Sequence, residues 1–431
     1  AGEQTHEGTR HAHGVYRVPE DKLQAWAKEP DLWAKGQWFY KWADFTQPVQ
    51  VDAEKGVLTV RSVPGAFRRE FGYRSGAPFR VMNAVSEMNR PGEWVIDRKN
   101  RRFRMRTSPG GTTVFAGKAS LLSGEGLHDV VFDGLTVEYA AESAVDFRHV
   151  TNVTFRASVV RHVGGYGVSA TESSNVRVSG CEIYDIGEGG IRLSGGWGYS
   201  VAGRQAPTVR MFGCPAVAQT PGDWRIVPSG NVAENNEIFD YGKVIPNYRP
   251  GISLGGVGCR AEHNLIHHSD HQAIQFFGND HVIAWNVIHD VCMDNCDAAA
   301  IYACEKDFTR RGTEIAHNLI YMVGTKPATA HTHAIYLDDW TCGCRVHHNL
   351  INRASDGIIL NGGQDNLVCS NLVVNAQVLA SQFDHGPRSS CAYACQPGRE
   401  SRVMKILYGD RARYESEIWR TKYPRLAELF T

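Results

Sequence analysis

Short apolar strand patterns, each broken by a single asparagine, recur through the second half of the chain. Six copies align, and the repeated residue falls at Asn236, Asn264, Asn286, Asn318, Asn349 and Asn371. The intervals are 28, 22, 32, 31 and 22 residues, so a minimal unit of about 22 residues carries insertions of up to about ten. A fixed internal period of this length is typical of solenoid proteins.

The same pattern continues towards the N-terminus in a degraded form. Leu135, Ser158 and Cys181 hold the asparagine position at two steps of 23 residues. A second phrase, typified by GISL, AIQF and AIYL, follows each of these positions, with one residue pointing out between two that point in. Short strands with no long helical pattern between them predict an all-β parallel β-helix, with three strands in each coil.

The repeated asparagines have a structural explanation. Asparagine tolerates the left-handed conformation of a tight turn, and its side-chain amide can hydrogen-bond the next coil. We therefore interpret them as a ladder that holds the coils together. Function is then expected at other positions of the coil.

The remaining segments suggest how the chain is divided. Residues 1–110 are predicted to form a Trp-rich cap or small β region, including a hairpin that turns at Lys99 and Asn100. The β-helix is expected over residues 111–380, interrupted by an insertion at 195–229 that lacks the period and suggests a functional loop. Residues 381–431 form a tail whose helical spacing predicts a C-terminal cap.

Composition narrows the class of partner. The chain has 431 residues and equal numbers of Lys+Arg and Asp+Glu, 46 each, which argues against nucleic acid as a partner. The chain contains no run of 18 apolar residues, so the sequence predicts no membrane span. We expect a secreted or periplasmic monomer that handles carbohydrate.

The 11 cysteines include no CxxC pair, so buried thiols or one or two disulfides are favoured over a metal. We expect no cofactor, and nothing indicates a structural or substrate-bridging Ca²⁺.

One row of side chains is predicted to point out of one sheet of the coil. The longest loops flank the same strands between residues 240 and 345, so we expect them to wall in a groove. The polar and aromatic members of the later coils suit sugar rings. The row reads Asp146, Ser169, Arg192, Ser253, Gln275, Tyr302, Tyr336 and Ile359.

Carboxylates concentrate in the same coils. Asp297 precedes the strand AAAIY, and Asp338 ends the corresponding strand of the next coil. Glycoside hydrolysis needs two carboxyl groups, separated by about 5 Å for retention and about 6.5 to 9.5 Å for inversion. Adjacent coils lie about 4.8 Å apart, so both aspartates can serve one bond if the loop before Ala298 folds back over the sheet. We predict Asp297 and Asp338 as the catalytic pair.

Other side chains near this pair are candidates for substrate binding. Trp340 could stack on a sugar ring, with a role as a loop anchor equally open. Histidines at junctions of loop and strand could bind hydroxyls or tune an acid, whereas His263, His317 and His348 directly precede ladder asparagines and are interpreted as structural. The predicted binding residues are Gln275, Tyr302, Tyr336, Asp339, Glu305, His271, His333 and Trp340.

Several motifs together resemble a known family. PGISLGGVG, HNLIHHSDHQAIQFFGNDH, DAAAIY, AIYLDD and GGQDN, with PGEWVIDR upstream and WRTKYPRLAEL near the end, resemble the bacterial right-handed parallel β-helix proteins of glycoside hydrolase family 141. The resemblance implies α-L-fucosidase or xylanase activity on plant cell-wall glycans. It also implies two catalytic aspartates, which match Asp297 in DAAAIY and Asp338 in AIYLDD.

Two other functions remain open at this point. A polysaccharide lyase or uronate epimerase would need Ca²⁺ or Arg to neutralise a uronate, and a base, for which Arg192, Tyr302 and Tyr336 are available. A non-catalytic carbohydrate-binding solenoid would need only the aromatic groove. Because the groove is richer in Asp than in basic residues, we favour hydrolysis of a plant or algal polysaccharide.

Overall fold

The computed structural model describes residues 14–60, 72–117, 119–196, 225–305, 307–324, 331–383 and 411–428. The chain forms two compact units, residues 1–115 and 116–431. Most of the insertion at 195–229 lies outside the described residues. No helix in the described ranges is long and apolar enough to cross a membrane.

The first unit is a small β domain, as predicted. Its sheet is antiparallel in the order β1-β4-β3-β2-β5 and encloses buried side chains that include Trp38 and Leu58. The predicted hairpin is present as β6 and β7, which pair antiparallel around the turn at residues 98–101. The elements are β1 (Val15–Arg17), α1 (Glu20–Trp26), β2 (Trp33–Gly36), β3 (Phe45–Asp52), β4 (Val57–Val60), β5 (Phe79–Met82), η2 (Val85–Glu87), β6 (Trp94–Asp97) and β7 (Arg102–Met105).

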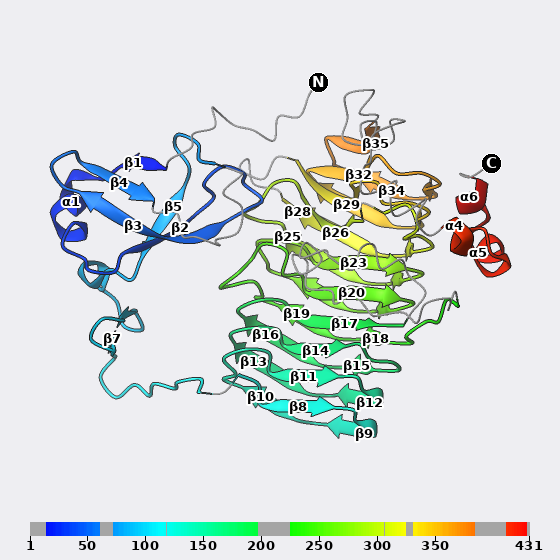
Figure 1. Cartoon of the computed structure of the whole chain (residues 1–431), viewed down its shortest axis with the longest axis horizontal. Helices are drawn as coiled ribbons and strands as arrows, with labels where there is room; N and C mark the ends of the chain where they lie inside the picture. Colours follow the sequence, from blue (N-terminus) through cyan, green and yellow to red (C-terminus); the bar gives the residue numbers. More distant parts are fainter. Residues whose placement is uncertain are drawn as a thin grey trace. The chain divides into compact units, whose positions relative to one another are not determined.

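The second unit is a parallel β-helix, which confirms the predicted architecture. Each coil contributes one strand to each of three sheets, and the coils stack from β8 to β35 (Figure 1). Sheet 1 contains β8 (Leu122–Glu125), β11 (Val145–Arg148), β14 (Val168–Thr171), β17 (Ile191–Gly195), β20 (Ile252–Val257), β23 (Ile274–Asn279), β26 (Ala298–Cys304), β29 (Thr332–Asp338), β32 (Asp356–Asn361) and β35 (Val378–Phe383).

The other two sheets follow in chain order within each coil. Sheet 2 contains β9 (His128–Asp133), β12 (Thr151–Arg156), β15 (Arg177–Ser179), β18 (Val232–Glu234), β21 (Arg260–Glu262), β24 (Val282–Ala284), β27 (Glu314–Ala316), β30 (Arg345–His347) and β33 (Leu367–Cys369). Sheet 3 contains β10 (Thr136–Glu138), β13 (Val159–Val163), β16 (Glu182–Ile186), β19 (Glu237–Phe239), β22 (Leu265–His267), β25 (Val287–Val291), β28 (Leu319–Val323), β31 (Leu350–Ala354) and β34 (Leu372–Val374).

Stacked apolar rows fill the interior. In sheet 1 the first apolar residue of each repeated phrase pairs with its counterpart on the next coil and is buried. Because side chains alternate between the two faces of a strand, the intervening residue must point outward. The buried row reads Val145, Val168, Ile191, Ile252, Ile274, Ile301, Ile335 and Ile358.

The asparagine ladder is confirmed. Asn286 is 1% exposed, and its Oδ1 accepts hydrogen bonds from the backbone and side-chain N–H groups of Asn264 at 3.0 and 2.9 Å. Its own Nδ2 donates to Asn318 Oδ1 on the next coil and to the carbonyl of Ala261. In the early coils, where the ladder asparagine is replaced, the link between coils is weaker. Ser158 Oγ accepts only the backbone N–H of Leu135, at 3.0 Å.

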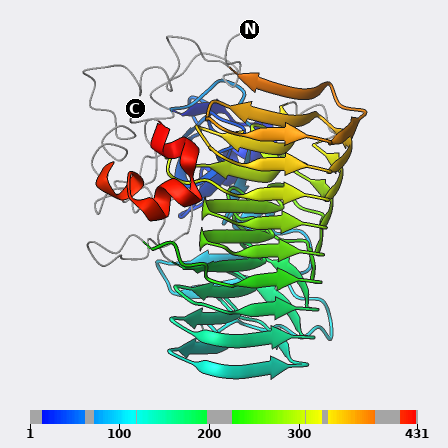
Figure 2. The same cartoon turned by 90° about the vertical axis from the view of Figure 1, so that its right-hand side faces the viewer.

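The predicted C-terminal cap is helical, but it lies along the side of the stack (Figure 2). The helices are α4 (Arg411–Tyr414), α5 (Glu417–Lys422) and α6 (Pro424–Ala427). Trp419 is fully buried in an apolar cluster that includes Trp340 of the β-helix. Tyr423 donates a hydrogen bond to Asp280 Oδ2 at 2.8 Å, and Arg425 pairs with Asp365. The helices therefore span several coils.

The cysteines of the described ranges are free thiols, and all but one are buried, which agrees with one of the two states expected. Cys214, Cys391 and Cys395 lie outside the described residues. The free cysteines are Cys181, Cys259, Cys292, Cys296, Cys304, Cys342, Cys344 and Cys369.

Candidate active site

The outward row of sheet 1 forms as predicted, but it is buried in the later coils. Gln275 pairs in register with Tyr302, which pairs with Tyr336. These side chains are only 0%, 2% and 5% exposed although they point away from the core. Tyr248, from the loop before β20, packs against Tyr302 with their rings 6.2 Å apart. An inserted loop therefore contributes to covering the row.

Asp338 ends β29 and is surrounded by hydrogen-bond donors. Its Oδ2 accepts the hydroxyl of Tyr302 at 2.7 Å. Its Oδ1 accepts the amide of Asn361 at 2.6 Å and the backbone N–H of Asp339 at 2.8 Å. Its carbonyl accepts the hydroxyl of Thr341 at 2.7 Å. These donors fix the carboxyl group in place and favour its ionised form.

A tight turn after Asp338 depends on the C-terminal helices. Asp339 and Trp340 both have positive φ, 39° and 67°, a conformation that is costly for a bulky residue unless its surroundings hold it. Trp340 is buried in the cluster with Trp419 and Tyr423. This packing places Trp340 as an anchor for the turn, the alternative to the stacking platform that its position also suggested.

Asp297 reaches the same place from the preceding coil. It lies directly before β26 in the left-handed conformation, with a φ of 53°, and its backbone N–H donates to the carbonyl of His331 at 2.9 Å. Tyr336 acts on both carboxyl groups, and its hydroxyl lowers the pKa of Asp297 and of Asp338. The loop thus folds back over the sheet as the pairing of the two aspartates required.

The two carboxyl groups have raised and different pKa values. Burial, together with the nearby charges of Asp338 and Asp339, raises the pKa of Asp297 to about 7. Burial and Asp339 raise the pKa of Asp338 to about 6, and the hydrogen bonds from Tyr302, Asn361 and Tyr336 oppose the rise. A better supply of donors around Asp338 therefore makes it the stronger acid of the pair.

The shared tyrosine indicates where the protons lie. A phenol has one proton, so Tyr336 can donate to only one of the two carboxyl groups. Asp338 already accepts hydrogen bonds from Tyr302, Asn361 and the backbone of Asp339, all of which favour its ionised form. The arrangement therefore suits a protonated Asp297 beside an ionised Asp338.

Two predicted binding residues are buried polar groups with no hydrogen-bond partner in the described structure. These are Gln275, whose amide nitrogen and oxygen are both unpaired, and His271, whose two ring nitrogens are unpaired. Burial and the Arg249 guanidinium lower the pKa of His271 to about 3, so its imidazole is neutral. Because unpaired buried polar groups are costly, they indicate a place prepared for a polar ligand.

The other predicted binding residues have partners within the protein. His333 lies beside Tyr336 with the rings 4.5 Å apart, and its Nδ1 is at ion-pair distance, 3.0 Å, from a carboxylate oxygen of Asp356 without forming a hydrogen bond. Glu305 is 6% exposed and accepts the backbone N–H of Gly278 and the guanidinium of Arg310. We assign Glu305 to fixing its loop, because donors occupy both of its oxygens.

Asp339 belongs to a small group that could be taken for a metal site. Cys304, Asp338 and Asp339 bring possible ligand atoms within 4.8 Å of one another. The thiol of Cys304 donates to Asp339 Oδ2 at 3.3 Å. These groups are therefore held together by hydrogen bonds within the protein.

Sequence reasoning missed two contributors to the site. Asn361 lies on the outward face of β32, two residues after Ile359, so register and alternation could have placed it beside Asp338. Tyr248 lies in a loop that was expected to wall the groove, but no periodic signal distinguishes it from its neighbours. The contact of Tyr248 with His271, with rings 5.2 Å apart, appears only in the structure.

Comparisons with known proteins address the fold. The family described as "Right handed beta helix region" matches residues 117–206, which confirms the predicted handedness. A solved structure described as a glycoside hydrolase matches with a TM-score of 0.61 and 15% identity, over 85% of this chain and 74% of that chain. A search of curated proteins finds no match.

Two further solved structures align at lower similarity. An alginate lyase from Paenibacillus sp. str. FPU-7 aligns with a TM-score of 0.37 and 10% identity, over 60% of this chain and 98% of that chain. The tailspike protein gp49 from Pseudomonas phage LKA1 aligns with a TM-score of 0.23 and 9% identity, over 88% of this chain and 66% of that chain.

Proposed function

We propose that the protein is a glycoside hydrolase that uses Asp297 and Asp338 on adjacent coils. The observation that carries the proposal is a pair of buried carboxyl groups on adjacent coils, close enough for the charge of Asp338 to raise the pKa of Asp297, of which Asp338 alone accepts hydrogen bonds from Tyr302 and Asn361. Two carboxyl groups with separated pKa values are the requirement for acid and base roles in this reaction.

Each aspartate takes the role that its surroundings favour. Asp297, with the higher pKa, protonates the oxygen of the leaving sugar. Asp338, held ionised by its donors, acts on the other side of the bond as the base for water or as the nucleophile. The anomeric form of the first product, followed by NMR, distinguishes these two roles.

The unpaired buried groups are assigned to the substrate. Gln275 and His271 have polar atoms that a sugar hydroxyl could satisfy, and Tyr248 and Tyr302 offer aromatic rings beside them. We propose a xylan- or fucose-containing glycan of plant or algal cell walls as the substrate. The protein would act as a secreted or periplasmic monomer.

The test compares three substitutions of one chemical type on one scaffold. Asp297→Asn and Asp338→Asn are expected to lower the release of reducing ends from a panel of xylans, fucosylated glycans, pectins and uronate polymers by about 10²-fold or more. The matched control is Asp146→Asn, in the same outward row, because Asp146 pairs with Arg148 in an early coil. This control is expected to keep full activity.

Two results would contradict the proposal. Unsaturated products that absorb in the ultraviolet and survive both substitutions would indicate a lyase. Glycan binding without any bond cleavage, unaffected by either substitution, would indicate a binding protein.

A further inference from the structure

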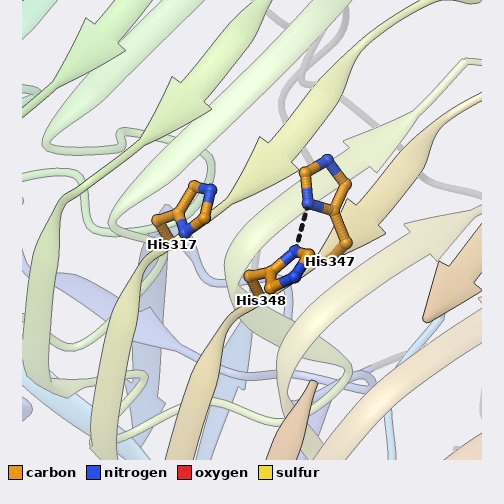
Figure 3. A group of neighbouring side chains, drawn as sticks. All are labelled: His317, His347 and His348. Carbon is orange, nitrogen blue, oxygen red and sulfur yellow. Dashed lines mark hydrogen bonds between the residues drawn. The ribbon is translucent and has the colours of Figure 1, made fainter. Parts of the chain in front are cut away.

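Three histidines come together on sheet 2, a different sheet from the one that carries the aspartate pair. His317 and His348 occupy the same turn position on adjacent coils, each directly before a ladder asparagine, with φ of 58° and 54°. His347 ends β30 and pairs in register with Ala316, which has a small side chain. The three rings gather at this point (Figure 3), and a possible ligand atom of each lies within 4.8 Å of the others.

The imidazole of His347 is held in one tautomer. Its Nε2 lies 2.9 Å from Glu314 Oε1, so Nε2 carries the proton and donates it to the carboxylate. Nδ1 of His347 then directs a lone pair towards Nδ1 of His348, 2.9 Å away. A carboxylate on the far nitrogen is the usual companion of a histidine that binds a metal.

The backbone beneath the rings is rigid. The ladder fixes both turns, since the N–H of Asn318 donates to Asn349 Oδ1 at 3.0 Å. The ring of Trp285 stacks on His317 with centroids 4.2 Å apart and planes at 4°. The ring of His348, on the next coil, stacks on the ring of His317 with their centroids 5.2 Å apart. The backbone positions that carry the three histidines are therefore fixed before any ion arrives, which favours binding.

We propose that His317, His347 and His348 bind one divalent ion of the Zn²⁺, Ni²⁺ or Cu²⁺ class across two adjacent coils. Imidazole nitrogen is a preferred ligand of these ions, whereas Mg²⁺ and Ca²⁺ prefer oxygen. Zn–N distances of about 2.0 to 2.1 Å place tetrahedral nitrogens about 3.4 Å apart, so the rings of His317 and His348 must rotate out of their stacked arrangement to direct a nitrogen at one ion. The ion takes the place of the proton between the two Nδ1 atoms, and His348 stays neutral by carrying its proton on Nε2 instead.

An ion has access to this position. His348 is exposed and His317 is partly exposed, while His347 is 9% exposed and forms the inner wall. The proposal uses no step of the proposed hydrolysis, so the two can fail independently.

Among the coils that the structure describes, one pair of adjacent coils carries all three histidines. Along the stack, the turn position reads His263, Trp285, His317, His348 and Ser370, and the strand end before it reads Glu262, Ala284, Ala316, His347 and Cys369. His263 therefore provides a matched control, because it has the same turn geometry, with a φ of 57°, and no second histidine beside it.

The experiment is calorimetric titration of the untagged, chelator-stripped chain with Zn²⁺. We expect one ion bound per chain in addition to any that binds elsewhere. His347→Gln or His348→Gln should weaken that site by at least about tenfold, and Glu314→Gln by about tenfold through loss of the orienting carboxylate. His263→Gln should leave it unchanged.

A second measurement separates binding from loss of folding. Zn²⁺ should raise the unfolding temperature of the native chain and of His263→Gln, but not of a variant in which all three ligands are Gln. Mg²⁺ should not raise the unfolding temperature of the native chain or of either variant. Circular dichroism of the metal-free variants shows whether the β-helix has formed.

Two outcomes would overturn the proposal. One is the absence of Zn²⁺ uptake by the folded native chain. The other is uptake that persists in the triple variant and is lost instead on changing His268 or His289, which with Asp290 form another close group, or the N-terminal histidines at positions 6, 11 and 13.

Discussion

The early and late coils of the β-helix share one backbone but treat their outward polar side chains differently. In the early coils, charged residues pair with partners 23 positions away, as Arg156 does with Asp133 at 2.7 Å and Arg161 with Glu138 at 2.7 Å. In the late coils, Gln275 lies buried with its amide unpaired. Inserted loops account for part of the difference, because they bring Tyr248 and Asp297 over the sheet.

This contrast shows where the fold serves stability and where it serves chemistry. A regular coil of 23 residues satisfies its own polar groups on the next coil. A coil that is covered by the inserted loop of a neighbouring coil keeps its ladder but leaves outward groups such as Gln275 buried and unsatisfied, a state that reduces stability and that a ligand can relieve.

The asparagine ladder should matter more in the late coils than in the early ones. Asn286→Ala removes a buried amide and leaves the backbone N–H of Asn264 and the carbonyl of Ala261 without their partner. We expect a loss of roughly 3 to 5 kcal/mol in the free energy of unfolding. Ser158→Ala, which removes one such acceptor in an early coil, should cost about 1 kcal/mol. Urea denaturation of both variants checks this, and equal losses would contradict the contrast.

Activity should be greatest between about pH 6 and pH 7. It falls below this range as Asp338 gains a proton and above it as Asp297 loses one, by about tenfold per pH unit far from the optimum. A pH profile of kcat/KM on a cleaved glycan measures both limits. An optimum outside this range would contradict the assigned roles.

The free energy of unfolding should fall as pH rises, because of the buried carboxyl group of Asp297. The pKa of Asp297 rises from 3.8 to about 7 in the fold, so the native state holds this proton more tightly than the unfolded chain. The contribution is fully present below about pH 4 and is lost as pH rises towards 7. Urea midpoints compared at pH 5 and pH 7.5 should fall less in Asp297→Asn than in the native chain.

Tyr336→Phe tests the link between the two aspartates. Removing the hydroxyl takes a donor from Asp338 and the contact that holds Asp297, so we expect kcat/KM to fall by about 10- to 100-fold. The lower limit of the pH profile should move upward, because Asp338 loses a donor that favours its ionised form. Lower activity with an unchanged profile would indicate that Tyr336 has only a packing role.

Replacing an unpaired buried amide should cost little stability. Gln275→Leu removes polar atoms that have no partner and keeps an apolar side chain of similar size, so the free energy of unfolding should change by less than about 1 kcal/mol or rise. Activity should fall if Gln275 meets the substrate. A large loss of stability would mean that the amide is satisfied within the folded protein.

Repetition explains which parts of the fold could be predicted from the sequence. The ladder and the outward row follow from a spacing near 22 residues and from strand alternation, so Gln275, Tyr302 and Tyr336 were placed in one row without a structure. The burial of that row could not be predicted, because Tyr248 lies in an insertion. The anchoring of Trp340 depends on Trp419, 79 positions later in the sequence and outside the repeat.

The histidines show a different limit of sequence reasoning. His317 and His348 were interpreted as structural because each precedes a ladder asparagine, and the ladder does fix their turns. The pattern of one coil gave no reason to examine His347, which pairs across to Ala316 on the coil before. A site shared between coils becomes visible only when equivalent positions are read along the stack.

The smallest effect is expected on the surface of the early coils. Arg156→Ala breaks the pair with Asp133, in which both side chains are about half exposed, at 54% and 47%. Exposed ion pairs contribute little, so the free energy of unfolding should fall by no more than about 0.5 kcal/mol, and less at high salt. Urea denaturation at low and high salt measures this. A loss of several kcal/mol would show that ion pairs between coils, and not only the buried rows, hold the regular stack together.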